Sequence, residues 1–251
     1  MPTEFADRFT GRAEPYARYR PRYSLEAVTW GMAQAGLRPG DVVADMGCGT
    51  GILTRHLLEA GLRVIGIEPN DDMRAQALEA TPDLDLRAAS AEDTGLEDGS
   101  VAAITAGQAI HWFDPVQIIP EWHRILRPGG RVLEFTNLRQ KEEPGWMAGF
   151  EALFDAHHLR RKQVGHAQRV RGTDWFVDPV AEEFPHQMEL DWEGVLGHCK
   201  SYSWFPLAPG EFEPALRALF EAHQVEGKIT MLYRTRVVVG RVPLGDRGVR
   251  P

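Results

Sequence analysis

The chain has 251 residues, 43% of them hydrophobic and 25% charged, and its formal net charge at pH 7 is −8. This composition is ordinary for a globular protein, and the length fits one large domain or a domain with a substantial insertion. The acidic balance disfavours a nucleic-acid partner, because binding phosphates requires a basic face. No apolar run approaches the ~18 residues of a membrane span, and the polar N-terminus is unlike a signal peptide.

The number and spacing of the cysteines and histidines indicate in which compartment the protein works and whether it binds a metal. Two cysteines, Cys48 and Cys199, do not make a disulfide framework, so we expect a cytoplasmic protein. Because no apolar run is long enough to span a membrane, no membrane partner is expected. The nine histidines show neither H-x-x-x-H nor paired-cysteine spacing, so no metal site is expected. The oligomeric state is expected to be a monomer or a homodimer.

Residues 1–23 are expected to form an N-terminal arm that ends in Tyr16-Ala-Arg-Tyr-Arg-Pro-Arg-Tyr23. Three tyrosines and three arginines within eight residues suit either a solvated arm or a segment that folds over a ligand. Tyr16, Tyr19 and Arg20 are the candidates for ligand contacts, since a guanidinium can pair with a carboxylate. Ser24 is expected to cap a helix over residues 25–35.

The stretch Val-Val-Ala-Asp-Met-Gly-Cys-Gly-Thr-Gly at residues 42–51 predicts a buried strand, a glycine turn and the start of a helix. Glycine lets a ligand approach the main chain, because it has no Cβ atom. The dinucleotide motif G-x-G-x-x-G fails here, since Ile52 stands where its third glycine belongs. Asp45 precedes the glycines, and its carboxylate suits a ligand that carries positive charge. We interpret Cys48 as a small residue that lines the site and not as a nucleophile.

A second buried strand over residues 62–68 ends in an acid. Glu68 follows Gly47 by 21 residues (68 − 47), the offset at which an acid at the tip of the neighbouring strand can accept both ribose hydroxyls. Asn70 is expected to cap the next helix. Met73 in its first turn either packs in the core or lies against an adenine ring.

Strands are expected at residues 84–88, 100–108 and 131–136, with a helix from Pro115 to about Leu126 that Asp114 caps. Helices that alternate with strands over residues 41–136 predict a parallel sheet, in which ligands bind at the carboxyl ends of the strands.

The second half of the chain breaks this alternation. Residues 137–183 are expected to be an inserted region with a helix at 144–157 and a basic stretch at 160–171, which is either a solvated loop or a contact for an anionic substrate. A sixth strand is expected at 184–190, a short helix at 192–199, a helix that carries Phe212, Leu216, Leu219 and Phe220 on one face, and a long final strand at 229–242.

Five motifs in the first half resemble those of the class I S-adenosylmethionine (SAM) methyltransferases of the small-molecule branch, similar to methyltransferase type 11. They are D-M-G-C-G-T-G, I-E-P-N, S-A-E-D, Q-A-I-H-W-F-D and L-R-P-G-G, in that order. The arm and the late stretches K-S-Y-S and L-Y-R-T-R more loosely resemble a subgroup that includes trans-aconitate-type carboxyl methyltransferases.

The resemblance implies an α/β, Rossmann-like sheet of seven strands, mostly parallel, with helices on both faces and an inserted cap. The last strand is then antiparallel and lies between the fifth and the sixth. The implied organisation is an arm at 1–23, a SAM-binding core at 24–136, a substrate-cap insertion at 137–183, C-terminal strands and helices completing the sheet at 184–242, and a tail at 243–251.

The same resemblance implies the site. SAM would be bound by residues of the arm, the glycine turn and the following strand tips: Tyr19, Arg20, Asp45, Gly47, Cys48, Gly49, Glu68, Pro69, Met73, Ala91, Glu92 and Gln108. Asp93 rivals Glu92 as the acid at the adenine edge. His111, with a pKa expected near neutrality, is the candidate general base, or else it orients the substrate.

The expected function is transfer of a methyl group from SAM to an oxygen, which includes a carboxyl oxygen, or to a nitrogen of a small molecule. Two alternatives stay open, a SAM-binding protein that transfers no methyl group and a methyltransferase that acts on RNA or protein. A carboxylate acceptor would need no general base.

Overall fold

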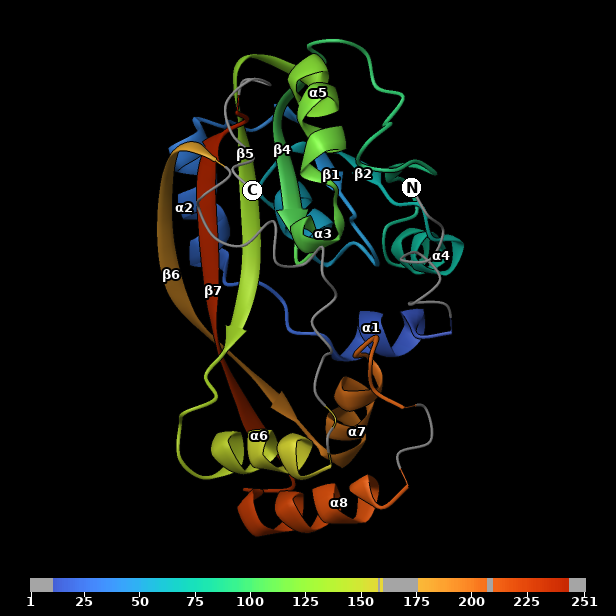
Figure 1. The fold of residues 1–251 in the computed structure, drawn as a ribbon, viewed down its shortest axis with the longest axis vertical. Coiled ribbons are helices and arrows are strands. Elements are labelled where there is room, and N and C mark those ends of the chain that lie inside the picture. The colour runs from blue at the N-terminus through green and yellow to red at the C-terminus, as the bar shows by residue number, and fades with distance from the viewer. Residues whose placement is uncertain (1–10, 158, 160–175, 207–209, 244–251) are drawn as a thin grey trace.

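The computed structural model describes residues 11–157, 159, 176–206 and 210–243. Its centre is one seven-stranded sheet with the strand order β3-β2-β1-β4-β5-β7-β6 (Figure 1). In chain order the strands are β1 (Val42–Met46), β2 (Arg63–Ile67), β3 (Asp85–Arg87), β4 (Val101–Gly107), β5 (Leu126–Arg139), β6 (Val177–Leu190) and β7 (Ile229–Arg241). The basic stretch at 160–171, residues 1–10 of the arm and residues 244–251 of the tail lie outside the described residues.

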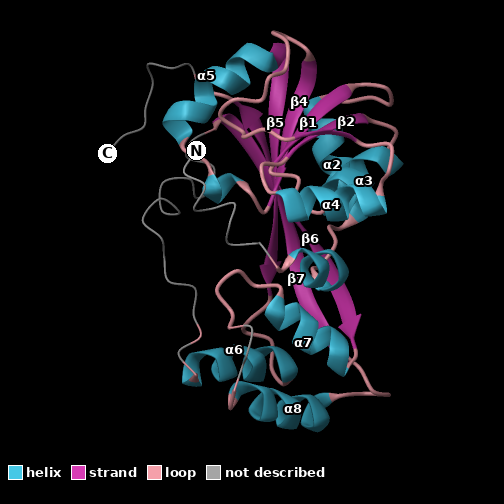
Figure 2. Ribbon diagram, turned by 90° about the vertical axis from the view of Figure 1, so that its right-hand side faces the viewer, coloured by secondary structure: helices cyan, strands magenta, loops and turns pink. Residues whose placement is uncertain are grey.

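Helices cover both faces of this sheet (Figures 1 and 2). The helices are α1 (Ala13–Tyr19), α2 (Leu25–Ala35), α3 (Ile52–Glu59), α4 (Asp71–Ala80), the 3-10 turn η2 (Ile110–Trp112), α5 (Pro115–Ile125), α6 (Trp146–Ala156), α7 (Trp192–Lys200) and α8 (Phe212–His223). Apolar residues of α2 and α3 form one core with Val43, Leu133 and Phe135. Residues of α5 form a second core with Ala44 and Ile104. Alternate residues of each strand therefore serve opposite cores, as a pleated sheet requires.

The strand directions confirm the expected fold. Strands β1 to β5 pair in parallel, whereas β7 is antiparallel to both β5 and β6. The stretch at 229–242 therefore lies between the fifth and sixth strands, as the family resemblance implied.

Three local predictions were wrong. Helix α5 ends at Ile125 and β5 begins at once, because the stretch around Pro128 is absorbed as an irregularity in the pairing of β4 with β5. Ser24 makes no capping hydrogen bond; its N–H donates to Oγ1 of Thr235, so the residue anchors the arm to β7. Strand β6 begins at Val177, before the expected start at Phe184.

Strands β6 and β7 extend beyond the sheet and carry a separate cap (Figure 2). Ile229, Met231 and Tyr233 at the start of β7 pack with α6, α7 and α8 in a third core. Val237 to Val239, further along the same strand, pack in the cores of the sheet. The cap thus draws helices both from the 137–183 region and from the later segment, and not from an insertion alone. In the part of the chain that the structure describes, no helix has the length and apolar character to cross a membrane.

Candidate functional site

The glycine turn after β1 has two glycines with different structural roles. Gly47 and Gly49 have φ angles of +61° and +57°, a region that favours glycine. A Cβ atom on Gly47 would lie 2.9 Å from Cβ of Ala109, so the packing here leaves no room for a side chain. A Cβ atom on Gly49 would meet no atom within 4 Å, so this position leaves open space above the main chain.

Asp45 lies at the end of β1 beneath the turn and is fully buried. Its Oδ2 accepts a hydrogen bond from Oγ1 of Thr54 at 2.6 Å, and its Oδ1 accepts one from Oγ1 of Thr105 at 2.8 Å. Burial raises the pKa of Asp45 to about 6, although both threonine hydroxyls act in the opposite direction. The carboxylate is therefore held by α3 and β4 as part of the floor of the site.

Glu68, just after β2, connects the glycine turn with the start of α4. Its Oε2 accepts from the N–H of Gly49 at 3.0 Å, and its Oε1 accepts from the N–H of Asn70 at 2.9 Å. Burial raises the pKa of this carboxyl group. Asn70 caps α4 by accepting from the N–H of Met73, as expected. The Met73 side chain is buried, while Pro69 is exposed.

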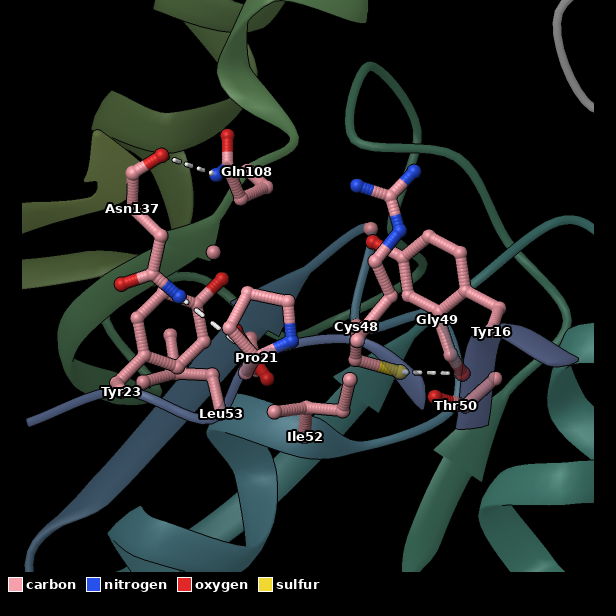
Figure 3. Close-up of a pocket in the computed structure, with 14 residues that line it drawn as sticks. Tyr16, Pro21, Tyr23, Cys48, Gly49, Thr50, Ile52, Leu53, Gln108 and Asn137 are labelled. Carbon is pink, nitrogen blue, oxygen red and sulfur yellow. Dashed lines mark hydrogen bonds between the residues drawn. The ribbon is translucent and has the colours of Figure 1, made fainter. Parts of the chain in front are cut away.

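A small cavity of about 40 Å³ lies over the glycine turn (Figure 3). The arm, the turn, the first turn of α3 and the ends of β4 and β5 enclose it: its lining residues are Tyr16, Arg20, Pro21, Tyr23, Asp45, Gly47, Cys48, Gly49, Thr50, Ile52, Leu53, Gly107, Gln108 and Asn137. Cys48 is buried, and burial raises the pKa of its thiol well above the ordinary value. The thiol is therefore protonated at neutral pH, which fits a lining residue and not a nucleophile.

Gln108 and Asn137 form one wall of this cavity (Figure 3). Gln108 has a φ of +55°, which is uncommon for a residue with a side chain, and its Nε2 donates to the carbonyl oxygen of Asn137 at 3.1 Å. Asn137 donates from Nδ2 to the carbonyl oxygen of Arg22 at 2.9 Å and accepts from Oγ1 of Thr235 at 2.7 Å. This wall therefore joins β4, β5, β7 and the arm.

The arm residue Arg20 stacks between two tyrosine rings. Its guanidinium carbon lies 4.8 Å from the ring centre of Tyr16 and 4.4 Å from that of Tyr202, and its Nη2 donates to the carbonyl oxygen of Ser201. The neighbouring Tyr19 does not line the cavity, and its hydroxyl donates to Oε1 of Glu193 at 2.7 Å. The structure thus brings Arg20 to the cavity and directs the Tyr19 hydroxyl toward α7.

A second, larger space of about 470 Å³ adjoins the cavity, and we call it the chamber. The cavity and the chamber share four lining residues, Arg20, Pro21, Gln108 and Asn137. The cap and the end of β5 supply the rest of its lining: Leu138, Arg139, Lys141, Glu151, Phe154, Asp155, Leu159, His198, Tyr202, Trp204 and Tyr233. Aromatic side chains line the chamber together with a larger number of polar and charged ones, a mixture that suits a polar small molecule.

Buried polar groups of the chamber form a connected network. Arg139 forms an ion pair with Glu151, whose other oxygen lies 3.4 Å from Nζ of Lys141. Arg139 also donates to the hydroxyl of Tyr202. Burial lowers the pKa of the ring of His198 to about 3, so this histidine is neutral at physiological pH.

The loop after β3 distinguishes the two candidate acids. Ala91 is buried, and its carbonyl oxygen accepts from Nε1 of Trp122 at 3.0 Å. Glu92 has a buried Oε2 atom without a hydrogen-bond partner, whereas Asp93 is exposed. A buried acceptor without a donor is costly, so the structure favours Glu92 over Asp93 as the predicted acid at the adenine edge.

His111, the candidate base, lies on η2 with its ring centre 4.8 Å from that of Trp112. It lines neither the cavity nor the chamber. Within the ranges that the structure describes, no cluster of three His, Cys, Asp or Glu side chains could hold a metal ion.

Of the expected cofactor residues, six line the cavity: Arg20, Asp45, Gly47, Cys48, Gly49 and Gln108. The roles of all expected site residues stay predictions. Sequence reasoning did not single out Asn137 or His198. The expected substrate cap at 137–183 contains several chamber residues, among them Arg139, Glu151 and Phe154, and the stretches K-S-Y-S and L-Y-R-T-R contain Tyr202 and Tyr233.

Comparison with known proteins gives matches to methyltransferases. Residues 44–133 match the family model described as "Methyltransferase domain". An uncharacterized methyltransferase of Mycobacterium tuberculosis is 42% identical over 132 residues, which are 53% of this chain and 52% of the relative. A demethylmenaquinone methyltransferase of Beutenbergia cavernae is 32% identical over 165 residues, 64% of this chain and 63% of the relative.

A solved structure from Anaeromyxobacter dehalogenans, assigned as a type II methyltransferase, has a TM-score of 0.72 and 27% identity, with 90% of this chain and 100% of that chain covered. The chain spans about half the length of the mycobacterial relative that it matches. Together, the sheet order, the family match and these relatives identify the region around residues 44–133 as a methyltransferase domain of the class I SAM-dependent type.

Proposed function

We propose that the protein transfers a methyl group from SAM, bound over the glycine turn, to a small-molecule acceptor bound in the chamber. The observation that carries this proposal is the shared wall of Arg20, Pro21, Gln108 and Asn137, because it makes the two spaces adjoin. The proposed acceptor atom is an oxygen, which includes a carboxyl oxygen, or a nitrogen. The Beutenbergia cavernae relative is itself named for a small acceptor, demethylmenaquinone.

The residues around the turn fit the proposed cofactor. The open space above Gly49 admits a ligand to the main chain, Glu68 lies beside it, and the orphaned Oε2 of Glu92 suits the exocyclic amine of an adenine. Gln108 would contact the methionine end and Arg20 its carboxylate. Since the cavity of about 40 Å³ is smaller than this ligand, the Tyr16 side chain must move outward when it binds.

Bound SAM would supply a methyl group on a sulfonium, a good leaving group, which the acceptor takes by in-line displacement. The chain then has to align the acceptor and exclude water, and alignment can supply ~7–11 kcal/mol of the barrier. The aromatic chamber walls and the arm do both. His198, the histidine of the chamber, is a poor base because its pKa lies at about 3. An acceptor that is already ionised, such as a carboxylate, suits this site.

Calorimetric titration with SAM and with S-adenosylhomocysteine tests the cofactor assignment. Wild-type protein is expected to bind both, and Glu68→Ala is expected to weaken binding by ~10-fold or more, because it removes the acceptor beside the turn. Release of S-adenosylhomocysteine in a screen of small metabolites then identifies the acceptor. Absence of binding at millimolar cofactor would refute the proposal.

A further inference from the structure

His198 on α7 makes contacts to three different parts of the molecule. Its ring is almost completely buried, with 1% of the residue exposed. Nδ1 lies 2.8 Å from the carbonyl oxygen of Tyr19, the last residue of α1. Nε2 lies 2.9 Å from the hydroxyl of Tyr202 and 3.1 Å from that of Tyr233. The histidine therefore connects the arm with two walls of the chamber.

The hydrogen-bond partners fix which nitrogen of the ring carries the proton. A carbonyl oxygen can only accept, so Nδ1 must donate to Tyr19. Burial is the main reason why the ring is neutral, and the charges of Arg20 and Arg139 add to it. A neutral ring carries one proton, so Nε2 is left as the acceptor for the tyrosine hydroxyls.

Arg20 is the residue that this arrangement holds in place. It follows Tyr19 directly, and its N–H donates to the carbonyl oxygen of Tyr16. Its guanidinium lies against the ring of Tyr202, whose hydroxyl bonds to His198. No carboxylate of the described residues forms an ion pair with Arg20, and its buried Nε has no partner. His198 thus fixes the main chain before Arg20 and the ring on which Arg20 lies.

We propose that His198 is a positioning residue for cofactor binding, which places the Arg20 guanidinium at the mouth of the cavity through the bond from Nδ1–H to Tyr19. The inference rests on the proposed function, since it takes the cavity as the site of the cofactor. It assigns the cap a role beyond enclosing the acceptor: one of its buried side chains controls the affinity for a ligand in the neighbouring space.

Two substitutions separate this role from a general contribution to stability. In His198→Asn, the amide nitrogen takes the place of Nδ1 and can still donate to Tyr19. In His198→Gln, the amide takes the place of Nε2 and serves the tyrosines but not Tyr19. We expect S-adenosylhomocysteine to bind His198→Asn within about 2-fold of wild type and His198→Gln about 10-fold more weakly, measured by calorimetry with melting temperatures recorded alongside.

Glu193→Gln is the matched control, because it weakens an exposed contact between α1 and α7 and should leave the affinity unchanged. Long-range ¹H–¹⁵N spectra of the ring should show the Nδ1–H tautomer at pH 7. Equal affinity of both His198 variants, losses that merely follow the melting temperatures, or an Nε2–H tautomer would each overturn the inference. Failure of the wild-type protein to bind S-adenosylhomocysteine would instead overturn the proposed function.

Discussion

The cavity and the chamber adjoin, yet they are built in different ways. Half of the cavity lining comes from residues 45–53, where glycines expose the main chain. The chamber is lined by side chains from the arm, β5, α6, α7 and β7, which are far apart in sequence. Glycines at positive φ tolerate few substitutions, whereas the side chains that line the chamber can be exchanged singly. We infer that substitutions of the chamber residues can alter its proposed ligand without altering the strand pairing of the sheet.

The charges of the two spaces also differ. The acids Asp45 and Glu68 lie at or beside the cavity and have raised pKa values. In the chamber, Arg139 and Lys141 surround Glu151, and Arg20 stands between the two spaces. A cationic sulfonium fits the first environment and an anionic acceptor fits the second. The following substitutions test this division.

The largest effect is expected for the buried ion pair of the cap. Arg139 and Glu151 have side chains that are 14% and 19% exposed. Arg139→Met should lower the free energy of unfolding by about 3–5 kcal/mol, because it leaves a buried carboxylate with only Lys141 nearby. The double variant Arg139→Met, Glu151→Leu should recover most of this loss. Urea unfolding measures both, and a double variant as unstable as the single one would contradict the assignment.

Asp45 should make stability depend on pH. Its pKa is raised from 3.8 to about 6, so between these values the folded protein binds a proton that the unfolded chain releases. The contribution of this group to the free energy of unfolding should therefore fall by about 3 kcal/mol in all as the pH rises from below 3 to above 7, with about 2 kcal/mol of the loss between pH 4 and 6. The difference between wild type and Asp45→Asn in urea unfolding measures it. If the free energy of unfolding of wild type relative to Asp45→Asn instead rises with pH, the prediction is wrong.

The two glycines of the turn should respond differently to alanine. Gly47→Ala adds a methyl group 2.9 Å from Ala109 at a positive φ, so the free energy of unfolding should fall by about 2 kcal/mol. In Gly49→Ala the added methyl group meets no atom, so the free energy of unfolding should fall by only about 1 kcal/mol, from the positive φ of the backbone. The affinity for the cofactor, by contrast, should fall by ~10-fold. Unfolding and calorimetry together distinguish packing from binding. If Gly49→Ala and wild type bind the cofactor equally tightly, Gly49 is not part of the cofactor site.

The smallest effect is expected on the surface between the arm and the cap. Arg18 and Glu193 are 60% and 69% exposed and lie 3.3 Å apart. Glu193→Gln should change the free energy of unfolding by less than ~0.5 kcal/mol, because water and salt screen such a pair. A larger loss in urea unfolding would show that this exposed pair helps to hold α1 against α7.

The parallel half of the sheet could be predicted from the sequence because its signals are local. Strands β1, β2 and β4 are apolar runs that end at a glycine or an acid, and Asn70 and Asp114 cap helices as expected. The start of β5 was missed, because the stretch around Pro128 normally marks a break and only pairing with β4 makes it part of a strand. Tertiary pairing there overrides the local preference.

For the site, the sequence predicted the turn and a cap over 137–183, but not which residues of the cap line the chamber. The spacing of Gly47, Gly49 and Glu68 is a local pattern, so it could be found without the structure. Asn137 and His198 carry no such pattern, since each acts through partners about 30 to 180 residues away. A buried histidine that bonds to a distant carbonyl oxygen looks like any other histidine in the sequence.

The two strands that run from the sheet into the cap determine which part of the molecule can open. At ~3.3 Å per residue, the 14 residues of β6 make a ladder about 46 Å long, paired with β7 almost throughout. A swing of the cap about a hinge would have to break this pairing, so we expect cap and sheet to keep a fixed separation. Exchange of ligands then depends on the short segment 11–23, and cross-linking that segment to α7 should halt turnover with the bound molecules trapped inside.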